Sequence, residues 1–314
     1  MALEDIRSER IKKLEKLQDP YPTSVRRTHL IGEVLKKFSV LAKAKKKLSV
    51  VGRIMAKREH GGSTFLDIQD ASGKIQIFLK KDVLEEKYDL ALAATDIGDF
   101  LEVEGKLFTT KRGEETAEVS SWKMLSKSLR PLPEKWHGLQ DVEERFRKRY
   151  LDLLMNQEVR ERFEVRSKII KALREFHEKN AFLEVETPML HPVPGGALAK
   201  PFKTHHNALD IDLYLRIAPE LYLKRLLIGG IERVYEIGKS FRNEGIDVSH
   251  NPEFTMLESY SAYWDEGNMM DFVENLFIAL AKNFAKKGLE REGKKISFKK
   301  PFARITFKDL LKRY

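Results

Sequence analysis

Residues 48–79, LSVVGRIMAKREHGGSTFLDIQDASGKIQIFL, contain three short runs in which apolar and polar side chains alternate. The runs cover residues 48–54, 63–68 and 74–79, and their two-residue period is typical of half-buried β-strands. Gly61-Gly62 and Asp70-Ala71-Ser72-Gly73 separate the runs and are residues that favour tight turns. The stretch therefore predicts three consecutive strands joined by hairpin turns.

The residues that follow extend this pattern into a complete small domain. A helix-like segment at 81–94 precedes two more strand candidates, around 100–104 and 117–125. Three strands, a helix and two strands within about 80 residues form the layout of an OB-fold β-barrel, which often binds single-stranded nucleic acid. We expect a five-stranded OB-fold barrel at 46–130, followed by a linker at 131–156 that begins at Arg130-Pro131-Leu132-Pro133.

Charge is concentrated before the barrel. The chain has 58 Lys and Arg against 48 Asp and Glu, and residues 1–50 hold 13 basic but only 6 acidic side chains. We expect residues 1–45 to form a basic helical extension, and such an excess suits a polyanion such as RNA. A solvated helical tail explains the same charge equally well.

Composition excludes several classes of protein. The chain has no cysteine, so it has no disulfide, no thiolate metal site and no cysteine nucleophile. It contains no apolar stretch long enough to span a membrane, and its charged start does not resemble a secretory signal. We therefore expect a cytoplasmic protein without a membrane partner.

The second half of the chain predicts an α+β domain at 157–314. A helix is expected at about 157–180, where Val165, Ile169, Ala172 and Phe176 would form a buried stripe. The strand candidates lie at 182–185, 211–217, 232–244 and 252–261, and a helix opens at Ala218-Pro219-Glu220. The last two strands predict an antiparallel hairpin with a long tip.

The predicted hairpin gathers side chains that suit a nucleotide. Period two places Arg242 with Glu244 on one strand, and Phe254 with Glu258 and Tyr260 on the other. An arginine pairs with phosphate, an aromatic ring stacks on a base, and carboxylates accept amine or hydroxyl donors. The alternative is that Phe254 packs in the core and the charged groups are solvated.

These residues carry a family resemblance. Phe241-Arg242-Asn243-Glu244-Gly245, continued by the segment 250–258, resembles motif 2 of class II aminoacyl-tRNA synthetases, and more closely that of bacterial lysyl-tRNA synthetases. Residues 182–188 resemble motif 1, the dimer-forming element, and residues 194–197 and 216–221 are similar to the amino-acid pocket. The resemblance implies a lysine–tRNA ligase that uses ATP and tRNA(Lys), with a homodimer built through motif 1.

The resemblance also implies roles for single residues. Arg242 would be catalytic, binding both the α-phosphate of ATP and the lysine carboxylate. The implied ATP-binding residues are Arg242, Glu244, His250, Asn251 and Phe254, with Phe254 stacking on adenine. The implied lysine-binding residues are Gly196, Glu220, Arg242, Glu258 and Tyr260. The implied anticodon-binding residues are Arg58, Phe65, Gln76 and Glu114, with Phe65 stacking on a uridine; from its pattern alone, Phe65 could equally be barrel core.

The sequence departs from the family in one respect. The third motif, a glycine-rich strand and helix with an arginine for the γ-phosphate, does not follow Glu258. The main Mg²⁺ ligands of the family belong to that same part, so the resemblance assigns no metal ligand to this chain. We expect 157–314 to hold motifs 1 and 2 only. A non-catalytic tRNA-binding fragment, or a relative of the aspartyl- and asparaginyl-tRNA synthetases, stays an alternative.

Overall fold

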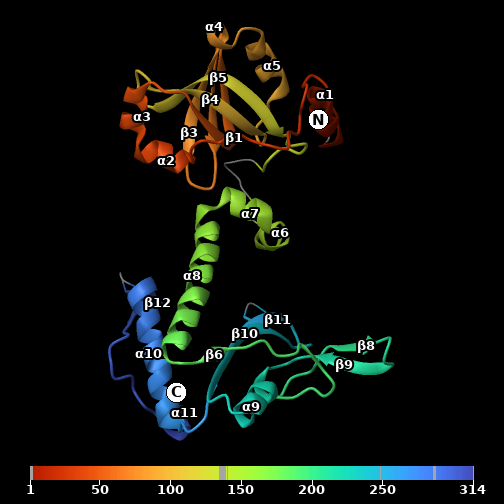
Figure 1. Ribbon diagram of the computed structural model, residues 1–314, viewed down its shortest axis with the longest axis vertical. Coiled ribbons are helices and arrows are strands. Elements are labelled where there is room, and N and C mark those ends of the chain that lie inside the picture. The colour runs from red at the N-terminus through yellow and green to blue at the C-terminus, as the bar shows by residue number, and fades with distance from the viewer. Residues whose placement is uncertain (1–2, 134–138, 140, 248, 286–287, 314) are drawn as a thin grey trace. The chain divides into compact units, whose positions relative to one another are not determined.

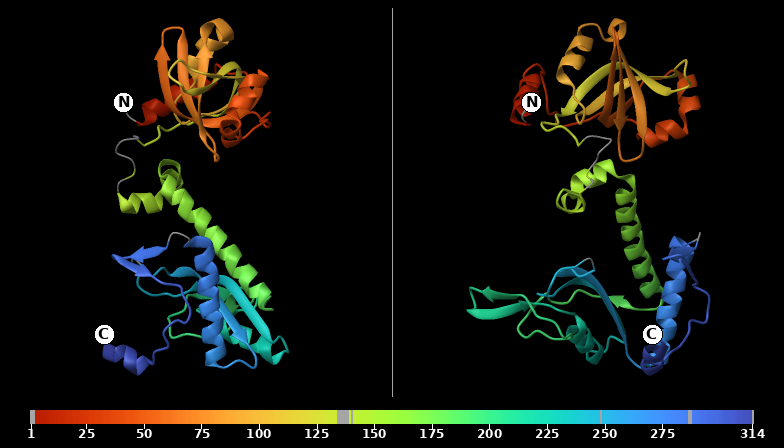
Figure 2. Two further views of the ribbon diagram at one scale, coloured as in Figure 1. Left: turned by 90° about the vertical axis from the view of Figure 1, so that its left-hand side faces the viewer. Right: turned by 180° about the vertical axis from the view of Figure 1, so that it is seen from behind.

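The computed structural model describes residues 3–133, 139, 141–247, 249–285 and 288–313. The chain divides into two compact units, Met1–Met155 and Asn156–Tyr314, which are described separately (Figures 1 and 2). Within the predicted linker, residues 134–138 and 140 lie outside the described part of the chain.

The first unit contains a closed five-stranded barrel with the strand order β1-β2-β3-β5-β4. Its strands are β1 (Leu48–His60), β2 (Ser63–Gln69), β3 (Lys74–Lys80), β4 (Phe100–Thr109) and β5 (Glu115–Ser126). The β3 and β5 strands pair in parallel, and the other neighbours are antiparallel. The predicted OB-fold barrel is thus confirmed, because the alternating pattern gives each strand one apolar face to turn inward.

Burial along β2 follows the sequence pattern directly. Leu66 and Ile68 are buried in the barrel, whereas Phe65 and Asp67 between them are half-buried on its outer face. The helical segment after β3 is divided at Glu85, whose φ of 51° interrupts the helical backbone. The result is two helices, α4 (Lys81–Leu84) and α5 (Glu86–Ala94), in place of the single predicted one.

The N-terminal helices belong to the barrel core. The helices α2 (Ile31–Lys36) and α3 (Phe38–Ala44) contribute Ile31, Val34 and Phe38 to the same hydrophobic cluster as the strands. The hydrophobic core of this unit therefore begins at Ile31, before the first strand. The predicted extension at 1–45 contains residues on which the packing of the barrel depends.

A buried ionic network holds the first helix, α1 (Leu3–Leu14), against the barrel. The ammonium of Lys127 is fully buried and binds the carboxylates of Asp96 and Asp99. Lys13 of α1 reaches the same Asp96, with 2.9 Å between its Nζ and Oδ1. Burial raises the pKa of Asp96, but the hydrogen bonds from Lys127 and Lys13 outweigh this effect and leave the pKa lowered.

The second unit is built around two small sheets. The first has the order β11-β10-β6, with β10 antiparallel to β11 and parallel to β6; the second has the order β7-β9-β8. The strands are β6 (Leu183–Glu184), β7 (Leu190–His191), β8 (Lys203–His206), β9 (Ile211–Leu215), β10 (Arg233–Phe241) and β11 (Glu253–Ser261). A further hairpin consists of β12 (Leu289–Arg291) and β13 (Lys294–Ile296).

Helices flank these sheets. Two short helices, α6 (Val142–Arg147) and α7 (Arg149–Met155), end the first unit. The helices of the second unit are α8 (Gln157–Lys179), α9 (Glu220–Ile228), α10 (Glu266–Phe284) and α11 (Phe307–Arg313). The core of this unit is aromatic: Phe182, Tyr235 and Phe272 are buried together, and the His177 ring stacks on Tyr235 with 4.5 Å between centroids.

The predicted buried stripe on α8 is wrong. Val165 is 41% exposed, and Ile169, Ala172 and Phe176 are only half-buried. Instead, the buried residues of α8 are Val159 and His177. Periodicity shows which side chains share a helix face, but whether another element covers that face depends on the rest of the fold.

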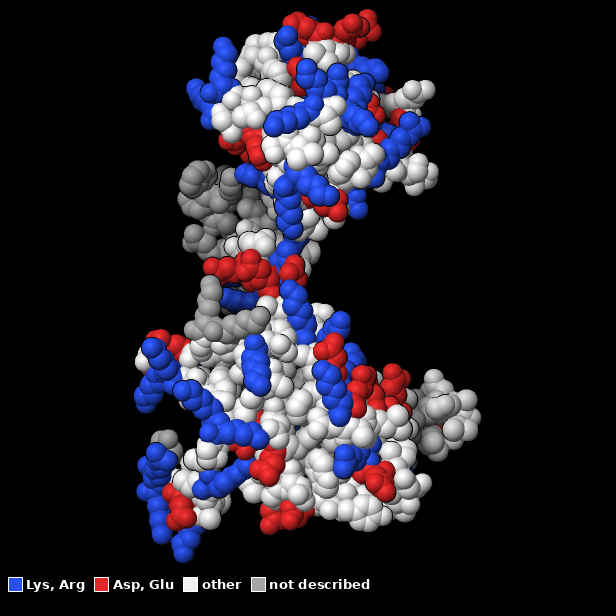
Figure 3. Space-filling view, turned by 60° about the vertical axis from the view of Figure 1, so that its left-hand side comes forward, with Lys and Arg blue, Asp and Glu red and all other residues white. Residues whose placement is uncertain are grey.

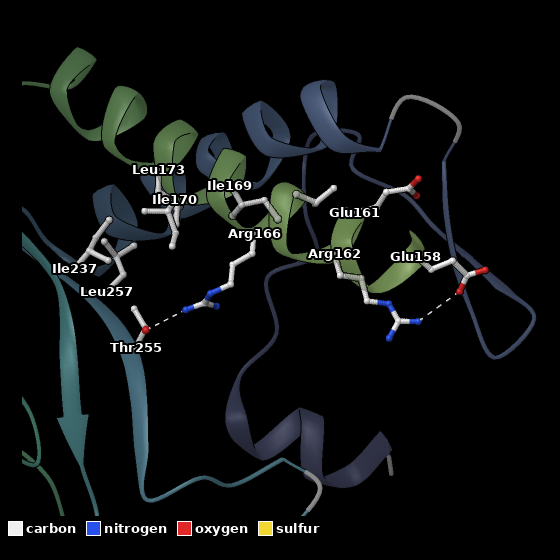
Figure 4. Close-up of a pocket in the computed structure, with 11 residues that line it drawn as sticks. Glu158, Glu161, Arg162, Arg166, Ile169, Ile170, Leu173, Ile237, Thr255 and Leu257 are labelled. Atoms are coloured by element: carbon white, nitrogen blue, oxygen red, sulfur yellow. Dashed lines mark hydrogen bonds and ion pairs between the residues drawn. The ribbon is translucent and has the colours of Figure 1, made fainter. Parts of the chain in front are cut away.

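An open apolar groove results on this side of the unit. Ile169, Ile170 and Leu173 of α8 face Ile237 and Leu257 of the β10–β11 hairpin across it (Figure 4). At its polar end, the Arg166 guanidinium donates to Thr255 Oγ1 at 3.0 Å. The odd-numbered residues of the hairpin thus face α8, which leaves the even-numbered residues for the opposite face of the sheet.

Candidate functional site

The even-numbered face of the β10–β11 hairpin is rich in charge. In the strand register, Glu236 lies directly opposite Glu258, and Ser240 lies opposite Phe254. Like charges placed opposite each other destabilise a strand pair unless a cation neutralises one of them. The two glutamates therefore need separate partners.

Arg216 is the partner of Glu236. Its Nη1 binds Glu236 Oε1, its Nε donates to the Lys239 carbonyl at 2.7 Å, and the Arg216 side chain is fully buried. Thr187 completes the network by donating its hydroxyl to Glu236 Oε2 at 2.6 Å. A Cβ at position 238 would overlap the Arg216 guanidinium, so Gly238 gives the arginine its place.

Glu258 has no cationic partner among the described side chains. The Tyr260 hydroxyl donates to Glu258 Oε2 at 3.1 Å, which is a neutral contact. Burial raises the pKa of Glu258 and the nearby Glu220 carboxylate raises it further, whereas the Tyr260 hydrogen bond and the more distant Arg216 charge lower it, so that the pKa stays raised. Burial also raises the pKa of Tyr260. A cation placed here would relieve the cost of the half-buried carboxylate.

Glu220 belongs to the same group of residues. It begins α9, and its Oε1 lies 2.6 Å from the ammonium of Lys224, which also lies 5.9 Å from the Tyr260 ring. Gly196 is beside it: a Cβ at this position, where φ is +89°, would lie 3.1 Å from the Glu220 Cβ. The structure thus brings Gly196, Glu220, Glu258 and Tyr260 together.

Arg242 and Phe254 form a second group. The guanidinium carbon of Arg242 lies 5.2 Å from the centroid of the Phe254 ring. The Arg242 backbone N–H donates to the Pro252 carbonyl at 2.8 Å, while its Nε is buried and has no partner in the described part of the chain. An unpaired buried donor beside an aromatic ring suits an anionic ligand that also carries a flat ring system.

The predicted strand position of Arg242 and Glu244 is wrong. The β10 strand ends at Phe241, so both residues lie in the loop, where strand alternation does not fix their directions. The Glu244 carboxylate accepts from the Lys200 backbone N–H at 3.4 Å. Pairing with β11 stops where the hairpin opens, and the sequence alone does not mark this point.

The remaining predicted nucleotide contacts are exposed in this loop. His250 Nδ1 lies 2.7 Å from Asp247 Oδ2, and Asn251 is exposed next to it. Backbone hydrogen bonds from Ser249, together with the hydrogen bond to His250, lower the pKa of Asp247. Among the described contacts, no side-chain interaction joins Glu244, His250 or Asn251 to Arg242 or Phe254.

On the barrel, the predicted anticodon residues share the outer face. Phe65 on β2 pairs with Phe78 on β3, and the two rings stack with 4.7 Å between their centroids. Phe108 on β4 extends the row, with its ring centroid 6.0 Å from that of Phe78. The core alternative for Phe65 does not hold, because Phe65 is half-buried on the outer face.

Phe78 and Phe108 were missed by the sequence reasoning, although a signal for Phe78 was present. Phe78 lies two residues after Gln76 on the same strand, so period two places both on one face. Phe108 joins them only through the pairing of β4 with β5, which the sequence does not show. We call Phe65, Phe78 and Phe108 the aromatic row.

Polar groups surround the aromatic row. The Arg58 guanidinium donates to Asp67 Oδ1 at 2.8 Å and to Gln76 Oε1 at 3.0 Å. Gln76 in turn donates to Thr116 Oγ1 at 2.8 Å, and Thr116 donates to the Glu114 carbonyl at 3.2 Å. The structure therefore links all four predicted positions on one side of the barrel.

The described residues meet neither the requirements of a metal site nor those of a membrane-spanning helix. No group of three or more His, Asp or Glu side chains in the described ranges could hold a metal ion, so these residues do not fit a Mg²⁺ site. Within the same ranges, no helix is long and apolar enough to cross a membrane.

Comparisons with known proteins give matches to both parts of the chain. Residues 141–314 match the profile of tRNA synthetases class II (D, K and N), and residues 48–125 match that of the OB-fold nucleic acid binding domain. A lysine–tRNA ligase of Carboxydothermus hydrogenoformans is 53% identical over 302 residues, which cover 96% of this chain and 62% of the relative. One from Legionella pneumophila strain Lens is 50% identical over 98% of this chain and 63% of the relative. The chain thus spans less than two thirds of their length.

Proposed function

The chain belongs to the class II tRNA synthetases (D, K and N), and we propose that its activity is that of a lysine–tRNA ligase. In the first step, a lysine carboxylate oxygen attacks the α-phosphorus of ATP. The bond from that phosphorus to the bridging oxygen of pyrophosphate breaks, which gives lysyl-adenylate and pyrophosphate. In the second step, the lysyl group passes to the terminal ribose of tRNA(Lys) and AMP leaves.

One observation carries the choice of amino acid. Arg216 neutralises Glu236 and Lys224 binds Glu220, whereas Glu258 forms no ion pair among the described residues. A substrate with two ammonium groups supplies the positive charge that this half-buried acidic group lacks. Glu220 and the Gly196 carbonyl would bind the α-ammonium, and Glu258 with Tyr260 would line the rest of the pocket.

An aspartate or asparagine ligase is the other reading within the family. A pocket for the aspartate side chain requires a cation with a free charge, but Glu236 already neutralises Arg216, even though the Arg216 Nη2 has no partner among the described residues. Aspartate would instead place a third carboxylate near Glu220 and Glu258, which like-charge repulsion opposes. The relatives at 50–53% identity, which are lysine–tRNA ligases, also support lysine.

Arg242 would act at the reacting atoms. Its free Nε would donate to an α-phosphate oxygen, and the guanidinium would also bind the lysine carboxylate, so that nucleophile and phosphorus are held together. Phe254 would stack on adenine, with Glu244, His250 and Asn251 closing over the nucleotide from the loop. This arrangement stabilises the charge that develops on the phosphoryl oxygens during attack.

The barrel would bind the anticodon of tRNA(Lys). Phe65 would stack on a base, and Arg58, Gln76 and Glu114 would donate to or accept from base edges. We further propose a cytoplasmic homodimer that associates through residues 182–188. Leu183 is about half exposed there, and so are Met189 and Leu190 directly after it, which supports a partner surface.

The test of the amino-acid assignment is pyrophosphate exchange by this chain extended with the C-terminal part of a relative. Exchange should depend on lysine and should not occur with aspartate or asparagine. Glu258→Gln should raise the KM for lysine about tenfold or more, because a neutral amide binds an ammonium less strongly than a carboxylate does. Glu292→Gln, an exposed change on the β12–β13 hairpin, is the matched control.

The alternative of a non-catalytic tRNA binder is tested in the same experiment. Its support is that the chain spans only 62% of the length of a relative while the barrel surface is complete. Lysine-dependent exchange by the extended chain excludes this alternative. RNA binding without exchange, in a chain that is folded, would favour it over the ligase.

A further inference from the structure

The segment 31–47 has a surface that neither the amino-acid pocket nor the aromatic row uses. It holds six lysines and a single acidic residue, Glu33. Its apolar residues Ile31, Val34 and Phe38 face the barrel core, so the lysines between them are directed to solvent. The exposed lysines of α2, α3 and the turn that follows are Lys36, Lys37, Lys43, Lys45 and Lys46.

These five lysines, which we call the lysine surface, are not neutralised by the protein. Lys47 binds Glu104 with 3.4 Å between Nζ and Oε1, but the described residues provide no ion pair for the other five. Elsewhere on the barrel, Lys81 pairs with Asp89 and Lys123 pairs with Asp19. Lys and Arg side chains gather on the side of the barrel unit that comes forward in Figure 3. Uncompensated charge of one sign attracts a polyanion.

The backbone keeps the lysine surface compact. Lys45 has a φ of 52°, in the left-handed region, and ends α3 with a sharp turn. The chain therefore enters β1 only three residues later, and Lys45 and Lys46 stay next to the end of the helix. Lys43, Lys45 and Lys46 thus lie directly before the start of β1, and Lys36 and Lys37 lie at the end of the preceding helix, α2.

The chemistry of the lysine surface differs from that of the aromatic row. An ammonium is a point charge that binds phosphate without reading sequence, and Lys36, Lys37, Lys43, Lys45 and Lys46 include no ring or amide among them. The aromatic row, with Arg58 and Gln76, has the stacking and fork-shaped donors that bind exposed bases. Strand β1 connects the two, since it begins after Lys47 and carries Arg58 opposite Phe65.

We propose that the lysine surface binds the phosphate backbone of a double-stranded RNA stem whose loop lies on the aromatic row. The inference rests on the proposed function, because it takes the anticodon arm of tRNA(Lys) as that RNA. Base-paired RNA hides its base edges in a deep groove, so its phosphates are what side chains of this kind can reach. The lysine surface thus increases the affinity for the anticodon arm, and the aromatic row provides the specificity for the sequence of its loop.

The experiment measures binding of two RNA probes to the chain 1–314 by fluorescence anisotropy over a range of salt. One probe is the anticodon stem-loop, and the other is its loop alone as a single strand. Lys43→Ala combined with Lys46→Ala should make the plot of log affinity against log salt for the stem-loop shallower by about two, and weaken binding about tenfold at low salt. The control combines Lys81→Ala with Lys123→Ala and removes the same charge.

Binding of the loop alone should be nearly unchanged by the Lys43 and Lys46 changes. Equal salt slopes for wild type, the Lys43 and Lys46 variant and the control would overturn the proposal, as would equal weakening of both probes. A different result would show that the proposed function itself is wrong. If the barrel does not bind the anticodon, Phe65→Ala leaves the affinity for the stem-loop unchanged. Circular dichroism spectra and melting temperatures show whether each variant is folded.

Discussion

In the second unit, the charges of neighbouring side chains determine the protonation and the ligand preference of single residues. Glu236 and Glu258 occupy opposite positions of one hairpin, yet only Glu236 has an arginine. The pKa of Glu258 is raised because burial disfavours its charged form, and the Tyr260 hydrogen bond and the Arg216 charge compensate only in part. Arg242 is the converse case, a half-buried arginine next to Phe254 whose buried Nε has no hydrogen-bond partner among the described residues. A ligand with an ammonium and a phosphate satisfies both.

We predict that Arg242→Ala abolishes adenylate formation in the extended chain without unfolding it. Loss of a preorganised donor to the reacting phosphate removes stabilisation that exists mainly in the transition state, so exchange should fall by about a hundredfold or more. Pyrophosphate exchange is the measurement, and Arg291→Ala, an exposed change on β12, is the control. Exchange within tenfold of wild type would exclude the catalytic assignment of Arg242.

At the scale of elements, the aromatic row depends on three strands being held side by side. Phe78 supports Phe65 by stacking, so we predict that Phe78→Ala weakens stem-loop binding by about 1–3 kcal/mol even where Phe65 is intact. Phe78→Leu, which keeps most of the apolar volume, shows how much of the loss comes from the ring itself. Anisotropy titration measures the affinity for the stem-loop. Unchanged affinity in a folded Phe78→Ala protein would contradict the supporting role of Phe78.

His177 connects α8 to β11 through both of its ring nitrogens. Its Nε2 lies 2.8 Å from Ser259 Oγ and its Nδ1 lies 2.7 Å from the Leu173 carbonyl. Burial lowers the pKa of His177 below its ordinary value of 6.5, and the Leu173 hydrogen bond and the Glu184 charge oppose this shift only in part. The unfolded chain therefore binds a proton more readily than the folded one.

It follows that the stability from neutral His177 is fully present above pH 6.5 and is lost as the pH falls below it. We predict that the free energy of unfolding decreases over this range, and that His177→Gln, which cannot titrate, removes part of that decrease. Denaturant unfolding followed by circular dichroism at several pH values measures it. If the free energy of unfolding depends on pH in the same way in the wild type and in His177→Gln, groups other than His177 cause the dependence.

The network around Lys127 connects helix α1 to the barrel, and we predict that Lys127→Met destabilises this unit by about 3–5 kcal/mol. The change leaves Asp99, which is fully buried, without its counter-charge. Adding Asp99→Asn should recover part of the loss, because it removes the unpaired charge. Chemical denaturation is the measurement; Lys81→Met, at an exposed ion pair, should cost less than about 1 kcal/mol. A loss as small as the control's would refute the prediction.

At the scale of the whole molecule, the chain carries two predicted binding surfaces but spans only 62% of the length of a relative. We predict that residues 1–314 alone form lysyl-adenylate several orders of magnitude more slowly than the extended chain. Positioning and charge stabilisation supply nearly all the catalysis in phosphoryl-type transfer, and the arginine of the third motif does not follow Glu258. Lysine-dependent exchange measured on both proteins tests this, and comparable rates would show that the third motif is dispensable.

The sequence by itself determined the local elements of this protein. Alternation and turn residues at 48–79 predicted three barrel strands that the structure contains, and the Pro219-Glu220 start of α9 was equally clear. Such patterns depend on near neighbours in the chain, because period and turn chemistry are properties of a few consecutive residues. The residues around Arg242 and Glu220 were identified through their resemblance to family motifs, whereas strand alternation wrongly extended β10 to Glu244.

Only the tertiary structure decided which of these residues meet. The partner of Arg216 is 20 residues away at Glu236, and Thr187 approaches that pair from a third segment. The row from Phe65 to Phe108 depends on strand register, and the exposure of Val165 depends on what covers α8. Register, coverage and ion-pair choice arise from contacts between distant segments, whose free energies depend on burial and on competing partners. The physical reason is that no periodic pattern in one segment specifies the segment packed against it.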